Sequence, residues 1–318
     1  MVRIDFLNVG HGDCTVIQHA SQLLTMIDIN NGQEMDIDTL NELQEYYPLG
    51  LPQGEEILNE SLLLEKVAAQ GYNIDLTNPI DFLREQYPGK DIFRYIQSHP
   101  HKDHMCGLAA LYADGRKIHN FWDTAHSFVP PLKDENNADL AEYQAHQKGL
   151  RGNKILRLNR GASGIYYGEN PAGVKPGDGI EILHPPFGRN TSATGAAAEN
   201  PNNFSYILRL TYNGIKIIFG GDAEEAAWEE VAEYYGADLK CDILKASHHG
   251  RDTGYCAKAV ALMQPEYTIV SVGKKPETDA SSKYSNYCKN VWSTRWRGNI
   301  WVTIDDAGCG KIKSQYTR

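Results

Sequence analysis

Three of the chain's eleven histidines stand close together, at His99, His101 and His104, with Asp103 beside the last of them. The stretch SHPHKDHMCGL follows the apolar run DIFRYIQ, which favours a turn at the end of a buried strand. Imidazole nitrogens and carboxylate oxygens are ligands that zinc prefers, and catalytic sites keep one position open for water. The spacing predicts that His99 and His101 hold one ion while Asp103 and His104 hold a second.

Later segments offer the other side chains that a two-metal site needs. Asp222 ends the apolar run IIFGGD, where its carboxylate could bridge two cations or cap the next helix. The run DILKAS ends at two histidines, and we expect His248 to bind the second ion while His249 contacts substrate or donates a proton. His184, in EILHPP, could complete the first site or serve only as a turn residue. Lys245 could assist the leaving oxygen instead of His249.

The elements that must position these residues are short apolar runs with turns at their ends. Apolar runs rich in β-branched residues predict strands, and apolar spacing of three and four predicts helices. We expect strands within residues 2–9, 14–20, 23–29, 91–98, 180–186, 204–212, 215–222, 241–250, 267–273 and 299–306. We expect helices within residues 36–47, 61–70, 78–87, 105–115, 223–235 and 257–264, and a loop and then a helix within 129–150. Strands that end in metal-type residues and are followed by helices indicate an α/β fold with its chemistry at one sheet edge.

The domain organisation expected is a single domain over residues 1–318. A helical insertion at about 31–90 lies between two core strands, and a second, turn-rich insertion lies at about 123–178. The first insertion could dock a protein partner.

Composition narrows the classes of protein. The chain has 41% hydrophobic and 23% charged residues, and no apolar run approaches the roughly 20 residues that span a bilayer. We therefore expect no membrane association and, since the N-terminus does not read as a signal peptide, a cytoplasmic location. The six cysteines are scattered without a CxxC pair, which favours reduced thiols. A net charge of −10 disfavours non-specific binding to polyanions, although a local basic and aromatic segment near residues 281–302 could hold a phosphate or stack a base.

The motifs resemble those of the metallo-β-lactamase fold superfamily, and more closely the hydrolase domain of ComEC-type competence proteins. The matching pieces are FLNVGHGDCTVI, MIDIN, SHPHKDHMCGL, NNFSYILRL, IIFGGDAEEAAWEE, DILKASHHG and IVSVG. The resemblance implies an αββα sandwich and a binuclear site, with Asp13 and Asp28 orienting the ligands from behind. The ComEC-type pattern usually has Gln where His11 stands here.

The chemistry expected is hydrolysis with two divalent ions, zinc or manganese. They would share a hydroxide and Asp222, and Asp103 would also orient that nucleophile. We expect a phosphodiesterase or nuclease acting on nucleic acid or a nucleotide. The alternatives are a hydrolase of a small ester, lactone or nucleotide, and an effector subunit that is inactive without its partner.

Overall fold

The structure is a computed structural model of the chain. It describes residues 1–31, 60–126, 128, 137–164, 166–168, 177–188, 200–271 and 278–317. The helix expected within residues 36–47 lies outside the described residues. No helix in the described part of the chain combines the length and the apolar character that crossing a bilayer requires.

Two sheets form the centre of the molecule. Within the described residues the first has eight strands, in the order β14 (Gly310–Ser314), β13 (Ile300–Ile304), β1 (Val2–Phe6), β2 (Thr15–Gln18), β3 (Leu24–Ile27), β4 (Ile92–Ile96), β5 (Ile118–Trp122) and β6 (Lys154–Leu156). The second has six, in the order β12 (Asn290–Ser293), β11 (Tyr267–Val270), β10 (Ile243–Lys245), β9 (Ile215–Phe219), β8 (Ile207–Tyr212) and β7 (Ile180–His184).

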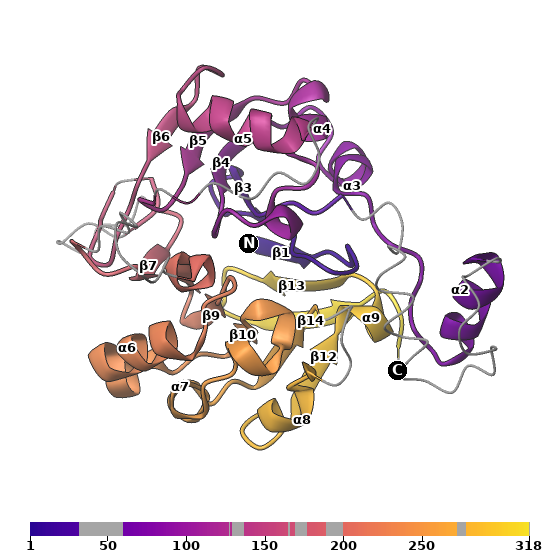
Figure 1. Ribbon diagram of the computed structural model, residues 1–318. Helices are drawn as coiled ribbons and strands as arrows, with labels where there is room; N and C mark the ends of the chain where they lie inside the picture. The colour runs from indigo at the N-terminus through magenta and orange to yellow at the C-terminus, as the bar shows by residue number, and fades with distance from the viewer. Residues whose placement is uncertain are drawn as a thin grey trace.

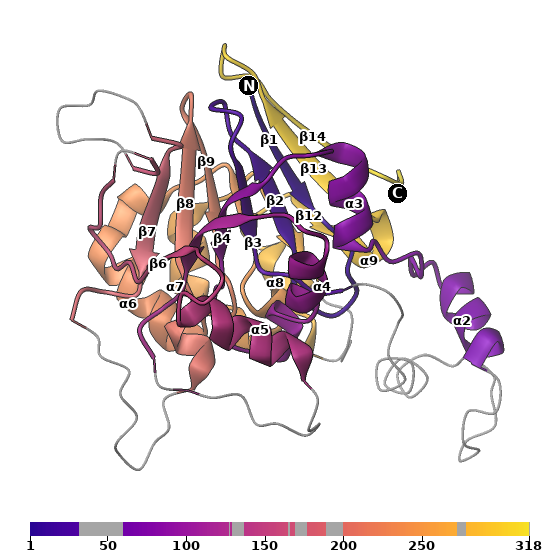
Figure 2. The ribbon, with the colours of Figure 1, turned by 90° about the horizontal axis from the view of Figure 1, so that it is seen from above.

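Helices cover the outer faces of both sheets (Figure 1). The first sheet carries α3 (Pro79–Gln86), α4 (Leu108–Ala113) and α5 (Ala138–Gln147), and the second carries α6 (Glu225–Tyr235), α7 (Ala257–Met263) and α8 (Ser281–Tyr284). The short α9 (Thr294–Arg297) links β12 to β13, and α2 (Glu60–Ala69) projects to one side of the sandwich (Figure 2). The layers are therefore helix, sheet, sheet and helix, which confirms the expected αββα sandwich.

Three buried clusters correspond to the three interfaces between these layers. The cluster between the sheets includes Phe6 and Phe219, whose ring centroids lie 6.1 Å apart. Tyr95 belongs to the cluster under α3, α4 and α5, whereas its neighbour Ile96 belongs to the cluster between the sheets. Successive side chains of a strand point to opposite faces, and both faces of β4 are covered, so its side chains are apolar or aromatic apart from Arg94.

Most of the expected elements are present, with shorter bounds. All ten expected strands appear, as do the expected helices that fall on described residues. Four strands were not expected: β5, β6, β12 and β14. The two proposed insertions remain an interpretation, although the end of the first is anchored: the ring centroids of Tyr72 and Trp296 lie 4.4 Å apart, and Thr77 Oγ1 donates to Asn299 Oδ1 at 2.9 Å.

A polar network is buried around Arg94, the middle residue of β4. Arg94 forms an ion pair of 2.8 Å with Asp178 and donates to Thr25 Oγ1 at 2.8 Å. His19 Nε2 lies 2.8 Å from the same Thr25 hydroxyl. Burial lowers the pKa of His19 to about 4, with Asp178 opposing and Arg94 adding to the effect. The imidazole is therefore neutral in the folded protein over the whole physiological range.

We expect His19 to make the protein less stable in mild acid. The unfolded chain binds a proton at His19 near pH 6.5, whereas the folded protein does so only near pH 4, so stability falls as pH falls between these values. Between pH 7.5 and 5 this contributes about 2 kcal/mol of lost unfolding free energy. Urea unfolding at both pH values should show a smaller loss for His19→Gln than for the wild type. His119→Gln, at an exposed histidine of β5, is the control, and an equal loss in all three proteins would contradict the expectation.

Candidate metal centre

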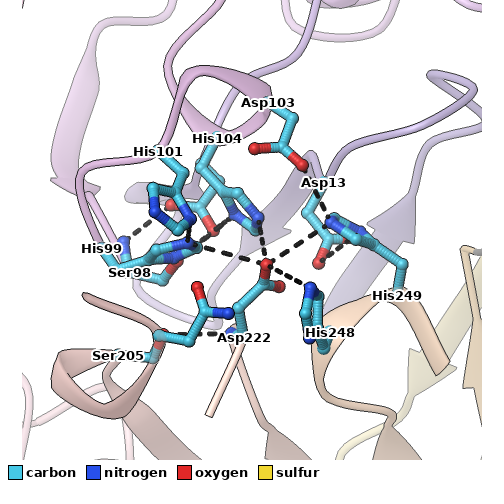
Figure 3. A network of polar contacts seen from close by, with 12 residues as sticks. Asp13, Ser98, His99, His101, Asp103, His104, Ser205, Asp222, His248 and His249 are labelled. Atoms are coloured by element: carbon cyan, nitrogen blue, oxygen red, sulfur yellow. Dashed lines mark hydrogen bonds and ion pairs between the residues drawn. The ribbon is translucent and has the colours of Figure 1, made fainter. Parts of the chain in front are cut away.

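Most of the residues expected to carry the chemistry lie close together, from His99 and His101 to Asp222, His248 and His249 (Figure 3). The His-rich segment follows β4 of the first sheet, and a short helical turn, η1 (Lys102–His104), ends it. Asp222 follows β9, and His248 and His249 follow β10, both in the second sheet. The site therefore spans both sheets.

Asp222 lies at the centre of the cluster, with its side chain only 2% exposed. Its Oδ2 atom is 3.2 Å from His104 Nε2, 3.5 Å from His249 Nε2 and 3.6 Å from His99 Nε2. The helix α6 is capped at Glu224, so Asp222 is not its N-cap. Asp222 therefore has the position of a bridging carboxylate, surrounded by imidazole nitrogens.

Two groups of ligand atoms surround this carboxylate. His101 Nδ1 lies 2.9 Å from His99 Nε2, and these two residues form with Asp222 one group whose ligand atoms lie within 4.8 Å of one another. His104, His249 and Asp222 belong to a second such group, which includes Asp13. Asp103 joins through His249 Nε2, which is 3.2 Å from its Oδ2 atom.

Buried carboxylates hold the far nitrogens of two of these histidines. His104 Nδ1 lies 2.8 Å from Asp28 Oδ2, and Asp28 also accepts from the Ser98 amide and hydroxyl. His249 Nδ1 lies 3.7 Å from Asp13 Oδ2 and 3.4 Å from Ser271 Oγ. Such contacts fix ring orientation and direct the other nitrogen toward a metal. This geometry supports the orienting role that the resemblance implied for Asp13 and Asp28.

Lys245 binds the residues that contact His249 Nδ1. Its ammonium group donates to Asp13 Oδ1 at 2.6 Å and to Ser271 Oγ at 2.9 Å, and the residue is 5% exposed. Burial alone would raise the pKa of Asp13, but Lys245 holds it well below its usual value. The contacts favour a positioning role for Lys245 over the leaving-group contact that we expected.

The positions of His248 and His249 differ from those that we expected. His249 is fully buried and lies among the ligand atoms, whereas the His248 side chain is 18% exposed and its Nε2 atom is 3.8 Å from Asp222 Oδ2. Thr253 Oγ1 lies 2.6 Å from His248 Nδ1. Both histidines have positive φ, a conformation that is uncommon outside glycine and turns the chain sharply after β10. The geometry favours His249 as the ligand and leaves His248 at the mouth of the site.

His184 is buried at the end of β7, and its Nδ1 atom lies 3.1 Å from the Ser205 carbonyl oxygen. Among the described residues, the groups of ligand atoms within 4.8 Å of one another do not include it. The expectation that it completes the first site gains no support from this geometry.

His11 is the residue that sequence reasoning did not place in the site. Its Nε2 atom is 3.3 Å from Asp103 Oδ2, and its ring centroid is 4.7 Å from that of His249. The signal was present in the sequence, because His11 stands between two glycines in GHGD, two residues before Asp13.

The side chains of the cluster have the chemistry that a bound cation requires. His104 Nε2 and one oxygen of Asp222, Oδ1, are buried without a hydrogen-bond partner in the described part of the chain. Burial alone would raise the pKa of Asp222, but His104, His249 and His99 hold it well below its usual value. Buried polar atoms without partners are unfavourable unless a ligand satisfies them. An ionised carboxylate among imidazoles, with ligand atoms that make no hydrogen bond, suits one or more divalent ions.

The chain therefore combines an αββα sandwich with a cluster of His and Asp ligand atoms at its edge that suits divalent metal. In sequence it is similar to ComE operon protein 3 of Bacillus subtilis, with 24% identity over 315 residues, which cover 99% of this chain and 33% of that protein. It also matches Competence protein ComA of Neisseria gonorrhoeae, with 28% identity over 98 residues, which cover 30% of this chain and 13% of that protein. The chain thus spans about a third of the length of the first relative. No family model matches the chain.

Solved structures with a similar backbone include the metallo-β-lactamase fold protein YhfI from Bacillus subtilis. It is 11% identical, with a TM-score of 0.46, and the match covers 98% of this chain and 100% of that one. Igni18, a metallo hydrolase from Ignicoccus hospitalis, is 13% identical with a TM-score of 0.44, and the match covers 99% and 100% of the two chains.

Removing the carboxylate behind His104 should weaken metal binding. Asp28→Asn keeps an oxygen for the Ser98 amide, and Asn tolerates the positive φ of 57° at this position, so the backbone is not newly strained. The loss of the His104 contact should lower metal affinity by about 10- to 100-fold, measured by calorimetric titration with zinc. Asp91→Asn is the matched control, because Asp91 makes the same kind of contact to exposed His119. Equal affinities in the two variants would contradict the orienting role.

Breaking the Lys245–Asp13 pair should destabilise the protein more than removing both charges. Lys245→Met leaves a buried carboxylate without its cation, which typically lowers the unfolding free energy by about 3–5 kcal/mol. The double variant Lys245→Met, Asp13→Asn should recover part of that loss in urea unfolding. Strictly additive losses would show that the two side chains do not depend on each other.

Proposed function

We propose that the chain is a metal-dependent phosphodiesterase that uses two divalent ions held around Asp222. The observation that carries the proposal is the convergence of three imidazole nitrogens, from His99, His104 and His249, on Asp222 Oδ2 at 3.2 to 3.6 Å. His99, His101 and Asp222 would hold one ion. Asp103, His104, His249 and Asp222 would hold the second.

Two bound ions would supply a nucleophile at neutral pH by lowering the pKa of water, and would neutralise charge that develops on a phosphoryl oxygen. The chain's own residues prepare the site for this. Asp28 and Asp13 fix the rings of His104 and His249, so that the Nε2 atom of each faces Asp222. Lys245 in turn holds Asp13 in its ionised form.

We assign the contact with substrate to His248. Its ring is partly exposed, faces Asp222, and is held by Thr253 at its other nitrogen. A hydrogen bond from this imidazole to a leaving oxygen would replace the role that we first expected for His249 and Lys245. Asp103, with a side chain 28% exposed, is the carboxylate best placed to orient the attacking water.

The preference for a phosphodiester rests on the similarity to proteins named for competence and on the ComEC-type motifs, since the αββα scaffold itself hosts many chemistries. The basic and aromatic tail adds little to it. Arg295 pairs with Asp279, and the Arg297 guanidinium lies 4.0 Å from the centre of the Trp292 ring, so both arginines already have contacts within the chain.

The test is cleavage of end-labelled single-stranded DNA, double-stranded DNA and RNA by the purified protein with added manganese or zinc. Asp222→Asn should lower the rate at least about a hundredfold, because it removes the central charge that would be shared by both ions. Asp91→Asn, on the surface away from this cluster, should cleave at the wild-type rate. Absence of cleavage by wild-type protein with two ions bound would refute the phosphodiester assignment and favour a small ester or lactone as the substrate.

A further inference from the structure

His11 lies beside the second ion's ligand set on an element that the metal motif does not include. It stands in the loop between β1 and β2, far in sequence from Asp103 and His249. Nevertheless its ligand atom lies within 4.8 Å of theirs, and the three residues form a separate group of potential metal ligands. The distances are 3.3 Å from His11 Nε2 to Asp103 Oδ2 and 3.2 Å from His249 Nε2 to the same oxygen. Asp103 therefore lies between two imidazoles.

The loop that carries His11 is fixed in place by several contacts. Asn30 Nδ2 donates to the carbonyl oxygens of His11 and Val9, at 2.6 and 3.1 Å. The Asp13 amide donates to the Asp103 carbonyl oxygen at 3.3 Å. Gly12 has a φ of +142°, and a Cβ atom there would lie 2.6 Å from the Asp103 carbonyl oxygen and 2.5 Å from Asn30 Nδ2. Only glycine allows this approach, so the loop is held directly against the His-rich turn.

One nitrogen of the His11 imidazole makes no hydrogen bond within the described residues. His11 Nδ1 is buried without a hydrogen-bond partner among the residues that the structure describes, and the side chain is 14% exposed. A buried imidazole nitrogen without a partner is unfavourable unless something binds it or the ring turns to use it. A surface histidine that happened to lie nearby would instead direct its free nitrogen to water.

We propose that His11 is an additional nitrogen ligand of the metal centre, on the side of Asp103 and His249. This inference rests on the proposed function only in its metal centre and not in its substrate. A further imidazole makes the donor set richer in nitrogen, which favours zinc over manganese, a metal that prefers oxygen ligands. A glutamine here, the residue usual in the ComEC-type pattern, would offer an amide oxygen and would weaken that preference.

The experiment titrates metal-depleted protein with zinc alone and with manganese alone, by calorimetry. Three proteins are compared: wild type, His11→Gln and the control His119→Gln, whose histidine is exposed on β5. His11→Gln should raise the zinc dissociation constant at least about tenfold and the manganese constant less than about threefold. His119→Gln should match the wild type for both metals, and circular dichroism checks that each variant is folded.

Cobalt binding gives a second readout that does not depend on turnover. If His11 supplies a nitrogen ligand, its replacement by glutamine should shift the visible d–d absorption of the cobalt-loaded protein, whereas His119→Gln should leave the spectrum unchanged. Unchanged zinc affinity and an unchanged cobalt spectrum in His11→Gln would overturn the inference and leave the proposed hydrolase standing. A wild-type protein that binds neither zinc nor manganese would overturn both. If zinc affinity is lower in His11→Gln but the wild type cleaves no phosphodiester, the result would support His11 as a metal ligand and refute the proposed substrate.

Discussion

A buried carboxylate surrounded by imidazoles is the constraint on which the rest of the site depends. Asp222 cannot keep its charge in an apolar interior unless positive charge lies close by, because the desolvation penalty for an isolated ion is several kcal/mol. Burial opposes protonation, but the surrounding carboxylates raise the pKa of His104 and of His249, and these two rings are in turn held by Asp28 and Asp13. The alternation of carboxylate and imidazole extends back to Lys245, so that charges of opposite sign adjoin at each step.

The fold makes this arrangement possible because the strands that carry these residues end at the same edge of the sandwich. The strands β3, β4 and β5 are parallel in one sheet, and β9, β10, β11 and β12 are parallel in the other. The carboxyl ends of parallel strands meet at one edge, where the turns that follow them are free to carry function. Apolar side chains fill the space between the sheets, so polar groups concentrate at the rim.

Most of the strands and helices could be predicted from the sequence, because each has a local pattern of apolar residues. The apolar run before His99 and the helix formers after Asp222 depend on local spacing, and the structure has β4 and α6 there. The short β6, β12 and β14 lack such a run and are strands only because a neighbour pairs with them. Local signals also predicted the His-rich motif, since its residues are adjacent along the chain.

Other features depended on contacts that no local pattern contains. Two successive positive φ angles bring His249 rather than His248 among the ligand atoms, and the local sequence does not predict that conformation. The pairing of Lys245 with Asp13 joins positions 232 residues apart. The approach of His11 to Asp103 is likewise a long-range contact, because it depends on Gly12 fitting against the backbone of another loop.

The division of the ligands between the two sheets also has a mechanical consequence. Asp28 and His104 follow strands of the first sheet and Asp222 follows a strand of the second, so the distance of 3.2 Å from His104 Nε2 to Asp222 Oδ2 depends on how the two sheets are aligned. A shift of one sheet relative to the other would change this distance. A substitution in the core between the sheets that displaces one of them would therefore also alter the geometry of this cluster.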